Sequence, residues 1–272
     1  MAGRLPGEGP ARLGPVTLPA GLPITGHGGD QVAWATVDPV PESGRIWAAL
    51  SGLHPQTGLV PIQLDGLRGD TNRPWDAGAF ARPEDPRQAD ALDAGAVLEG
   101  LWRDWLPPPD EDDPEWAEMR APFTREFPGV AEPVQMTLTP AERLQALDSV
   151  LPRIRLEHRA TPTARIGLVA ADRPADVPAV IGWDGAYSRW ELLLPLTAVL
   201  RSWEDRFGAR LIDVGYADLR LLVDRPPRTL AAAQRIAAEQ VGLADECMEV
   251  GQAIPLIAAR LVNAPIWTFW WD

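Results

Sequence analysis

Ile266-Trp267-Thr268-Phe269-Trp270-Trp271-Asp272 is a strand-like aromatic run at the end of the sequence. Chain ends usually fray. This number of bulky rings in a terminal segment is therefore unusual. In a strand, Trp267, Phe269 and Trp271 point to one side and Trp270 to the other. We expect a mainly buried strand, with one aromatic row exposed if helices cover only one face of the sheet. The 12 Trp residues, against 2 Tyr and 5 Phe, indicate that large aromatics organise the fold.

Composition restricts the class of protein. Hydrophobic residues make up 46% of the 272 positions, which is enough for a core without metals or disulfides. The first residues lack the apolar segment of a signal peptide, and no apolar run has membrane-spanning length. We therefore expect a cytoplasmic protein with no membrane partner, in agreement with its single cysteine, Cys247.

The charge pattern excludes several functions. The net charge of −13 would repel phosphate backbones, so we expect no nucleic-acid partner. All 25 basic residues are Arg, and the absence of Lys excludes Schiff-base catalysis and a phosphate-loop lysine.

The first half of the chain, residues 1–160, reads as an α/β region. Residues 1–30 are rich in Gly and Pro and are expected to be a flexible lead-in, and 107–118 an acidic, solvated loop. Periodicity and turn residues predict strands and helices between them. The predicted strands are Gln31–Val37 and Leu59–Leu64, and the predicted helices are Ser43–Leu53, Ala89–Trp105 and Pro140–Leu151. His54-Pro55 should end the first helix, and Thr139 with Glu142 should form a capping box at the last.

The second half, residues 163–272, reads as a compact α+β domain. Its predicted strands are Arg165–Val169, Pro178–Ile181, Arg210–Gly215, Asp218–Asp224 and the segment after Pro265. Its predicted helices begin near Pro195, at Thr229 and near Gln252, and end near Gly208, Gly242 and Val262 respectively. Hairpin-type links with helices between them predict a mixed, mostly antiparallel sheet with helices packed mainly on one face.

This second half resembles the family known as domain of unknown function 4253. The resemblance is carried by short segments, listed here: Ile166–Val169, Val180–Asp184, Leu200–Ala209, Asp224–Pro227 and the closing Phe269–Asp272. The region around Trp47 and His54–Gly58 is similar to the first half of longer members. The resemblance implies a domain boundary near residue 163 and no particular chemistry.

No catalytic residues, metal ligands or cofactor site are predicted. Asp30, His54 and Ser51 could form a triad only by arbitrary assembly, and His54 is better explained as a residue stabilising a helix end. The sequence lacks zinc-type His or Cys spacing, and Asp110–Asp113 lacks the alternation of a calcium loop. Gly26–Gly29 lacks the context of a phosphate loop and is interpreted as a turn.

Two hypotheses for function remain. The first is a non-catalytic module that binds another protein, for example an immunity-like protein that blocks a basic toxin. The second is a hydrolase or glycan-binding protein that uses carboxylates beside exposed Trp, or His54. The candidate binding residues are two indole–carboxylate pairs and the neighbouring aromatics: Trp183, Asp184, Trp267, Trp270, Trp271 and Asp272.

Overall fold

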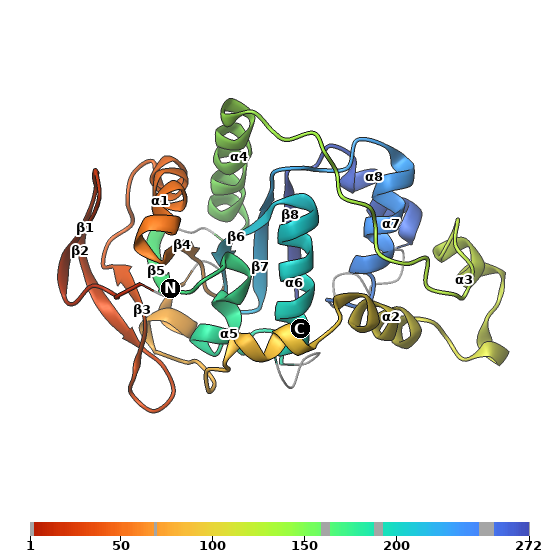
Figure 1. Cartoon of the computed structure of the whole chain (residues 1–272), viewed down its shortest axis with the longest axis horizontal. Helices are drawn as coiled ribbons and strands as arrows, with labels where there is room; N and C mark the ends of the chain where they lie inside the picture. Colours follow the sequence, from red (N-terminus) through yellow and green to blue (C-terminus); the bar gives the residue numbers. More distant parts are fainter. Residues whose placement is uncertain (1–2, 68–69, 159–163, 188–192, 245–252, 272) are drawn as a thin grey trace.

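One continuous eight-stranded sheet forms the centre of the computed structural model (Figure 1). The structure describes residues 3–67, 70–158, 164–187, 193–244 and 253–271. The strand order is β1-β2-β3-β5-β4-β6-β7-β8, and every pairing is antiparallel except β4 with β6. The strands are β1 (Gly9–Leu13), β2 (Val16–Thr25), β3 (Gln31–Thr36), β4 (Leu59–Leu64), β5 (Arg165–Ala170), β6 (Ala209–Val214), β7 (Asp218–Val223) and β8 (Ile266–Trp270).

Helices cover both faces of the sheet, the larger group on one of them. The α-helices are α1 (Ser43–Thr57), α2 (Ala94–Trp105), α3 (Pro114–Met119), α4 (Pro140–His158), α5 (Val177–Ile181), α6 (Leu194–Phe207), α7 (Leu230–Gln240) and α8 (Ile254–Leu261). Shorter helical turns are η1 (Asn72–Asp76), η2 (Pro86–Ala91), η3 (Pro109–Glu111) and η4 (Pro174–Asp176). Side chains of α2, α5, α6, α7 and α8 share the main core, whereas α1 and α4 pack on the opposite face. The expected α+β class with a mostly antiparallel sheet is confirmed.

The terminal aromatic run is a strand, as predicted. Trp267 and Phe269 are buried in the main core, and Trp203 of α6 lies 5.5 Å and 5.3 Å from them between ring centroids. Trp270 points to the other face and is 39% exposed. The structure therefore has one buried aromatic row and one exposed indole on β8, as the alternation of a strand requires.

Local sequence signals place several helix ends. Thr139 and Glu142 form the predicted capping box at the start of α4, with a 2.7 Å bond from the Thr139 amide to the Glu142 carboxylate. Thr229 caps α7 through its hydroxyl. Gly208 ends α6 in the left-handed region, with φ 62°, which a residue without Cβ adopts freely.

Five sequence-based expectations are wrong. Part of the lead-in 1–30 forms β1 and β2, which build one edge of the sheet. Helix α1 continues through Pro55 to Thr57, and the expected helix 89–105 is split into η2 and α2. Residues 177–181 form helix α5 with Pro178 in its first turn, where a missing amide costs nothing. The acidic loop 107–118 contains η3 and most of α3.

The two halves of the sequence share the sheet. Strand β5, from the second half, lies between β3 and β4 of the first half, and β6 pairs with β4. Among the described residues, no helix combines the length and apolar character needed to cross a lipid bilayer.

Candidate functional site

Three of the predicted binding indoles are core residues. Trp183, Trp267 and Trp271 are at most 2% exposed, and Trp183 meets Trp271 edge to face at 5.4 Å. The indole nitrogens of Trp183 and Trp271 donate to the carbonyl oxygens of Gly215 and Leu243, both at 2.9 Å. These rings therefore join loops to the core and leave no ring face for a partner.

Two of the predicted binding residues lie at the surface. Trp270 and Asp184 are exposed, whereas Asp272 lies outside the described residues. A sugar platform needs an exposed ring face, and the buried Trp183 beside Asp184 does not supply one. A binding role for Trp270 and Asp184 stays a prediction.

His54 lies in a pocket between α1, the sheet and α6. The pocket has a volume of about 210 Å³, and its lining includes Trp47, Ser51, Glu204 and Arg210. The imidazole Nε2 of His54 lies 2.9 Å from the carbonyl oxygen of Ala171. His54 lies in the last turn of α1, the position that the predicted helix-end role requires, and its ring also contacts the residue that follows β5.

Glu204 is another titratable group of this pocket, which Asp172 and Arg210 also line. Burial raises its pKa, against the opposing charge of Arg173. Its carboxylate accepts bonds from Arg173 and from the amide of Ala175, both at 3.4 Å. In the described part of the chain, His54 and Glu204 bond to these other groups and not to each other. A hydrolase built on His54 stays a prediction.

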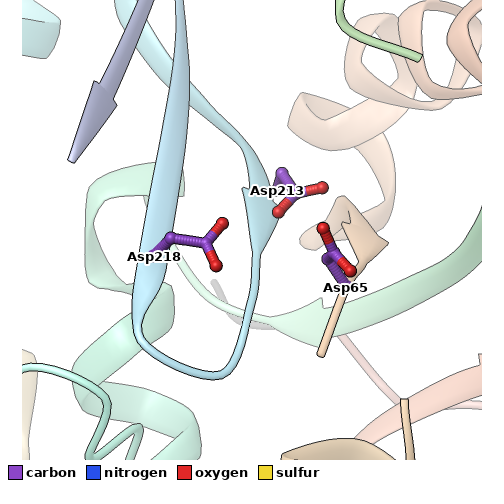
Figure 2. Close-up of side chains that lie close together, drawn as sticks. All are labelled: Asp65, Asp213 and Asp218. Atoms are coloured by element: carbon purple, nitrogen blue, oxygen red, sulfur yellow. The ribbon is translucent and has the colours of Figure 1, made fainter. Parts of the chain in front are cut away.

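A buried cluster of carboxylates is the feature that sequence reasoning missed. Asp65, Asp213 and Asp218 each offer an oxygen, and these atoms lie within 4.8 Å of one another. Figure 2 shows the three carboxylates pointing toward a common centre. Asp65 is 2% exposed and Asp213 is fully buried.

The sheet topology brings these residues together. Asp65 follows β4 directly, and the parallel pairing of β4 with β6 sets Gln63 beside Asp213. A β-bulge between Leu211 and Asp213 adds one residue to β6, and Asp213 pairs with Arg220 of β7. Asp218, which begins β7, lies two residues before Arg220 and so shares its face.

Arg220 is the counterion of the cluster. Its Nη1 lies 3.4 Å from Asp65 and 3.3 Å from Asp213, and its Nη2 lies 3.5 Å from Asp218. Burial alone would lower the pKa of Arg220, but the three carboxylates outweigh burial and raise it. Burial raises the pKa of Asp213 well above its usual value. The neighbouring carboxylates of Asp65 and Asp218 raise this pKa further, and the single guanidinium of Arg220 does not offset these effects.

The arrangement can do two things chemically. It can hold a proton on Asp213, or it can bind a hard cation through carboxylate oxygens. The signal in the sequence was an acid at the end of one predicted strand and acids on both sides of a predicted hairpin turn. Only the β4–β6 pairing, which joins residues about 150 positions apart, makes these acids one cluster.

A second acidic feature is a surface, which we call the acidic lobe: residues 94–119, comprising α2, η3 and α3. It lies at the opposite end of the molecule from β1 and β2 (Figure 1). Its exposed acids are Glu99, Asp104, Asp110, Glu111, Asp113, Glu115 and Glu118. Arg103 is the exposed cation within the lobe, and it pairs with Glu99 at 3.4 Å.

Residues 165–272 match the model of the family described as Domain of unknown function (DUF4253), so the chain carries a domain of this family. The match covers β5 to β8 and includes Asp213, Asp218 and Arg220, but not Asp65 or the acidic lobe. No curated protein matches the chain. No solved structure matches it either.

Proposed function

We propose that this protein is a non-catalytic interaction module that binds a basic protein through the acidic lobe. The observation that carries the proposal is the concentration of seven exposed acids against one exposed Arg in residues 94–119. Such a surface attracts a positively charged partner and accelerates its association. The same charge disfavours nucleic acids, and an immunity-like role against a basic toxin is one form of this function.

The lobe is held by an aromatic support, which favours a preformed binding surface. Trp102 packs on Trp105 with ring centroids 5.3 Å apart, and Trp105 meets Trp116 of α3 edge to face at 5.7 Å. Trp102 also contacts Phe123 and Phe127. A surface fixed before binding loses less entropy when the partner docks.

An ion-pair network fixes the turn between α2 and α3. Asp112 is mostly buried and contacts Arg120 at 2.5 Å and Arg125 at 3.0 Å. The side chain of Asp113 caps α3 through the amide of Trp116 at 3.0 Å. Asp112 and Asp113 therefore help to shape the lobe. The other exposed acids of the lobe remain to meet a partner.

The test is capture of partners from native lysate with the immobilised protein and two matched variants. The lobe variant carries Asp110→Asn, Glu111→Gln, Glu115→Gln and Glu118→Gln, all at exposed positions. The control carries Asp30→Asn, Asp38→Asn, Glu132→Gln and Asp148→Asn, also exposed, and has the same change in net charge.

We expect the wild-type protein and the control to capture a basic protein that the lobe variant loses. Capture should weaken steeply with salt, because exposed charges are screened. Equal capture by both variants, or a partner without excess positive charge, would refute the proposal.

A further inference from the structure

We propose that Asp65, Asp213 and Asp218 form a binding site for a divalent cation that prefers oxygen ligands, such as Ca²⁺, Mg²⁺ or Mn²⁺. This inference is independent of the acidic lobe. It concerns the buried end of the β4–β6 pair, and it can fail or succeed whatever the protein's partner is.

The first support is geometric. One oxygen from each of the three carboxylates lies within 4.8 Å of the other two, and the side chains converge from β4, β6 and β7 (Figure 2). Ligand oxygens about 2.1–2.5 Å from one ion are separated by distances of this order or slightly less. Small rotations of the carboxylates are therefore enough to close the site around a cation.

The second support is an unsatisfied buried side chain. Asp213 is fully buried, and neither of its carboxylate oxygens accepts a hydrogen bond from the part of the chain that the structure describes. Buried polar groups are normally hydrogen-bonded, and a buried carboxylate without a hydrogen bond strongly destabilises the fold when it is ionised. A bound cation would supply the missing partner.

Gln63 adds a neutral oxygen to the same face. Its Oε1 is buried and has no hydrogen-bond donor among the described residues, and Gln63 is directly beside Asp213 across the β4–β6 pairing. Amide oxygens are regular ligands of hard cations. No His or Cys belongs to the cluster within the described residues, which favours Ca²⁺, Mg²⁺ or Mn²⁺ over zinc.

Charge balance requires more than Arg220. Its guanidinium lies 3.3–3.5 Å from the three carboxylates, longer than the roughly 2.7–2.9 Å of strong charge-assisted bonds. When all three carboxylates are ionised, the one positive charge of Arg220 leaves two negative charges, which a divalent cation neutralises. The side chain of Asp218 is 15% exposed, so an ion can enter the site from the side on which Asp218 lies.

Two indoles provide a reporter next to the site. Trp75 donates to the carbonyl oxygen of Val214 at 3.0 Å, and Trp183 donates to that of Gly215 at 2.9 Å. These carbonyls follow Asp213 directly in the chain. Terbium, which occupies oxygen sites for Ca²⁺, should therefore luminesce when these indoles are excited.

The experiment uses the full chain, stripped with EDTA and then dialysed. Terbium luminescence and the melting temperature in Ca²⁺, Mg²⁺ or Mn²⁺ are measured for the wild type, Asp213→Asn and Asp224→Asn. Asp224 is a matched control because it is also buried but pairs with Arg143 and Arg210 away from the cluster. The Asn at 213 keeps the shape and removes a poorly compensated buried charge, so this variant is expected to fold.

We expect saturable binding of one ion per chain and a melting temperature that rises with cation concentration in the wild type and in Asp224→Asn. Asp213→Asn should bind at least about tenfold more weakly, a loss of about 1.4 kcal/mol or more. No saturable binding and no cation-dependent shift in the wild type would overturn the site. The same shift in Asp213→Asn would also overturn it, because that result would assign binding to surface carboxylates.

Discussion

Replacing Trp267 and Trp271 separately by Phe should give clearly different losses of stability, although both side chains are at most 2% exposed and face the same core. Each substitution removes the fused ring and leaves a cavity of at most about 40 Å³, worth about 1 kcal/mol. The two positions differ in the indole nitrogen. Trp271 donates to the carbonyl oxygen of Leu243 at 2.9 Å, whereas Trp267 Nε1 has no acceptor among the described residues.

The hydrogen bond decides the difference. In Trp271→Phe, the Leu243 oxygen loses its donor in a buried place, which adds about 1–3 kcal/mol to the cavity cost. In Trp267→Phe, an unsatisfied N–H is removed, and the resulting gain of about 1–2 kcal/mol offsets the cavity cost. We therefore expect about 2–4 kcal/mol of destabilisation for Trp271→Phe and a change within about 1 kcal/mol of zero for Trp267→Phe.

Urea unfolding measures these values, provided that the slope of free energy against urea is unchanged. Trp270→Phe is the control, because Trp270 lies on the same strand with 39% exposure and should change stability by less than about 1 kcal/mol. Equal losses at 267 and 271 would refute the assignment of their indole nitrogens. A loss at 270 as large as that at 271 would refute the assignment of the buried face of β8.

Three further predictions concern other buried contacts. Glu239→Gln should destabilise by about 3–5 kcal/mol in urea unfolding, because the buried Glu239 holds Arg206 in two bonds of 2.6 and 2.7 Å; a loss under about 1 kcal/mol would contradict this. Gly208→Ala should cost about 1–2 kcal/mol by the same assay, since φ is 62° and a Cβ would meet Asp224 at 2.9 Å; no loss would show that α6 ends differently. The folded-state pKa of Glu204 is raised above its usual 4.5, so ionisation of Glu204 favours the unfolded chain. Wild-type stability should therefore fall relative to Glu204→Gln as the pH rises from about 4.5 through the raised pKa. Parallel stability profiles of the two proteins against pH would contradict this.

Local rules in the sequence predicted a large part of the fold. The Thr139–Glu142 capping box, the Gly208 stop and the Thr229 cap each depend on residues a few positions apart, and each is confirmed. These signals fail where local preference is ambiguous. The short apolar run 178–181 suits a strand or a helix equally, and Pro178 is tolerated in the first turn of α5.

Partners distant in sequence decided the remainder. The Gly- and Pro-rich residues 9–25 read as loose chain, but they form the edge strand β1 and its neighbour β2, with a bulge beside Pro10, where a missing backbone amide is tolerated. The carboxylate cluster depends on the parallel pairing of β4 with β6 and on the bulge before Asp213, neither of which leaves a local pattern. The candidate indoles were chosen by residue type, and type alone does not tell a core Trp183 from an exposed Trp270.

Hydrogen–deuterium exchange with and without a captured basic partner tests most directly whether recognition lies in the acidic lobe. We predict slower exchange at 109–119 in the complex and unchanged exchange at 266–270, because β8 lies outside the lobe and its backbone pairs with β7 with or without a partner. Protection confined to 266–270, with exchange in the lobe unaltered, would contradict the proposed binding surface.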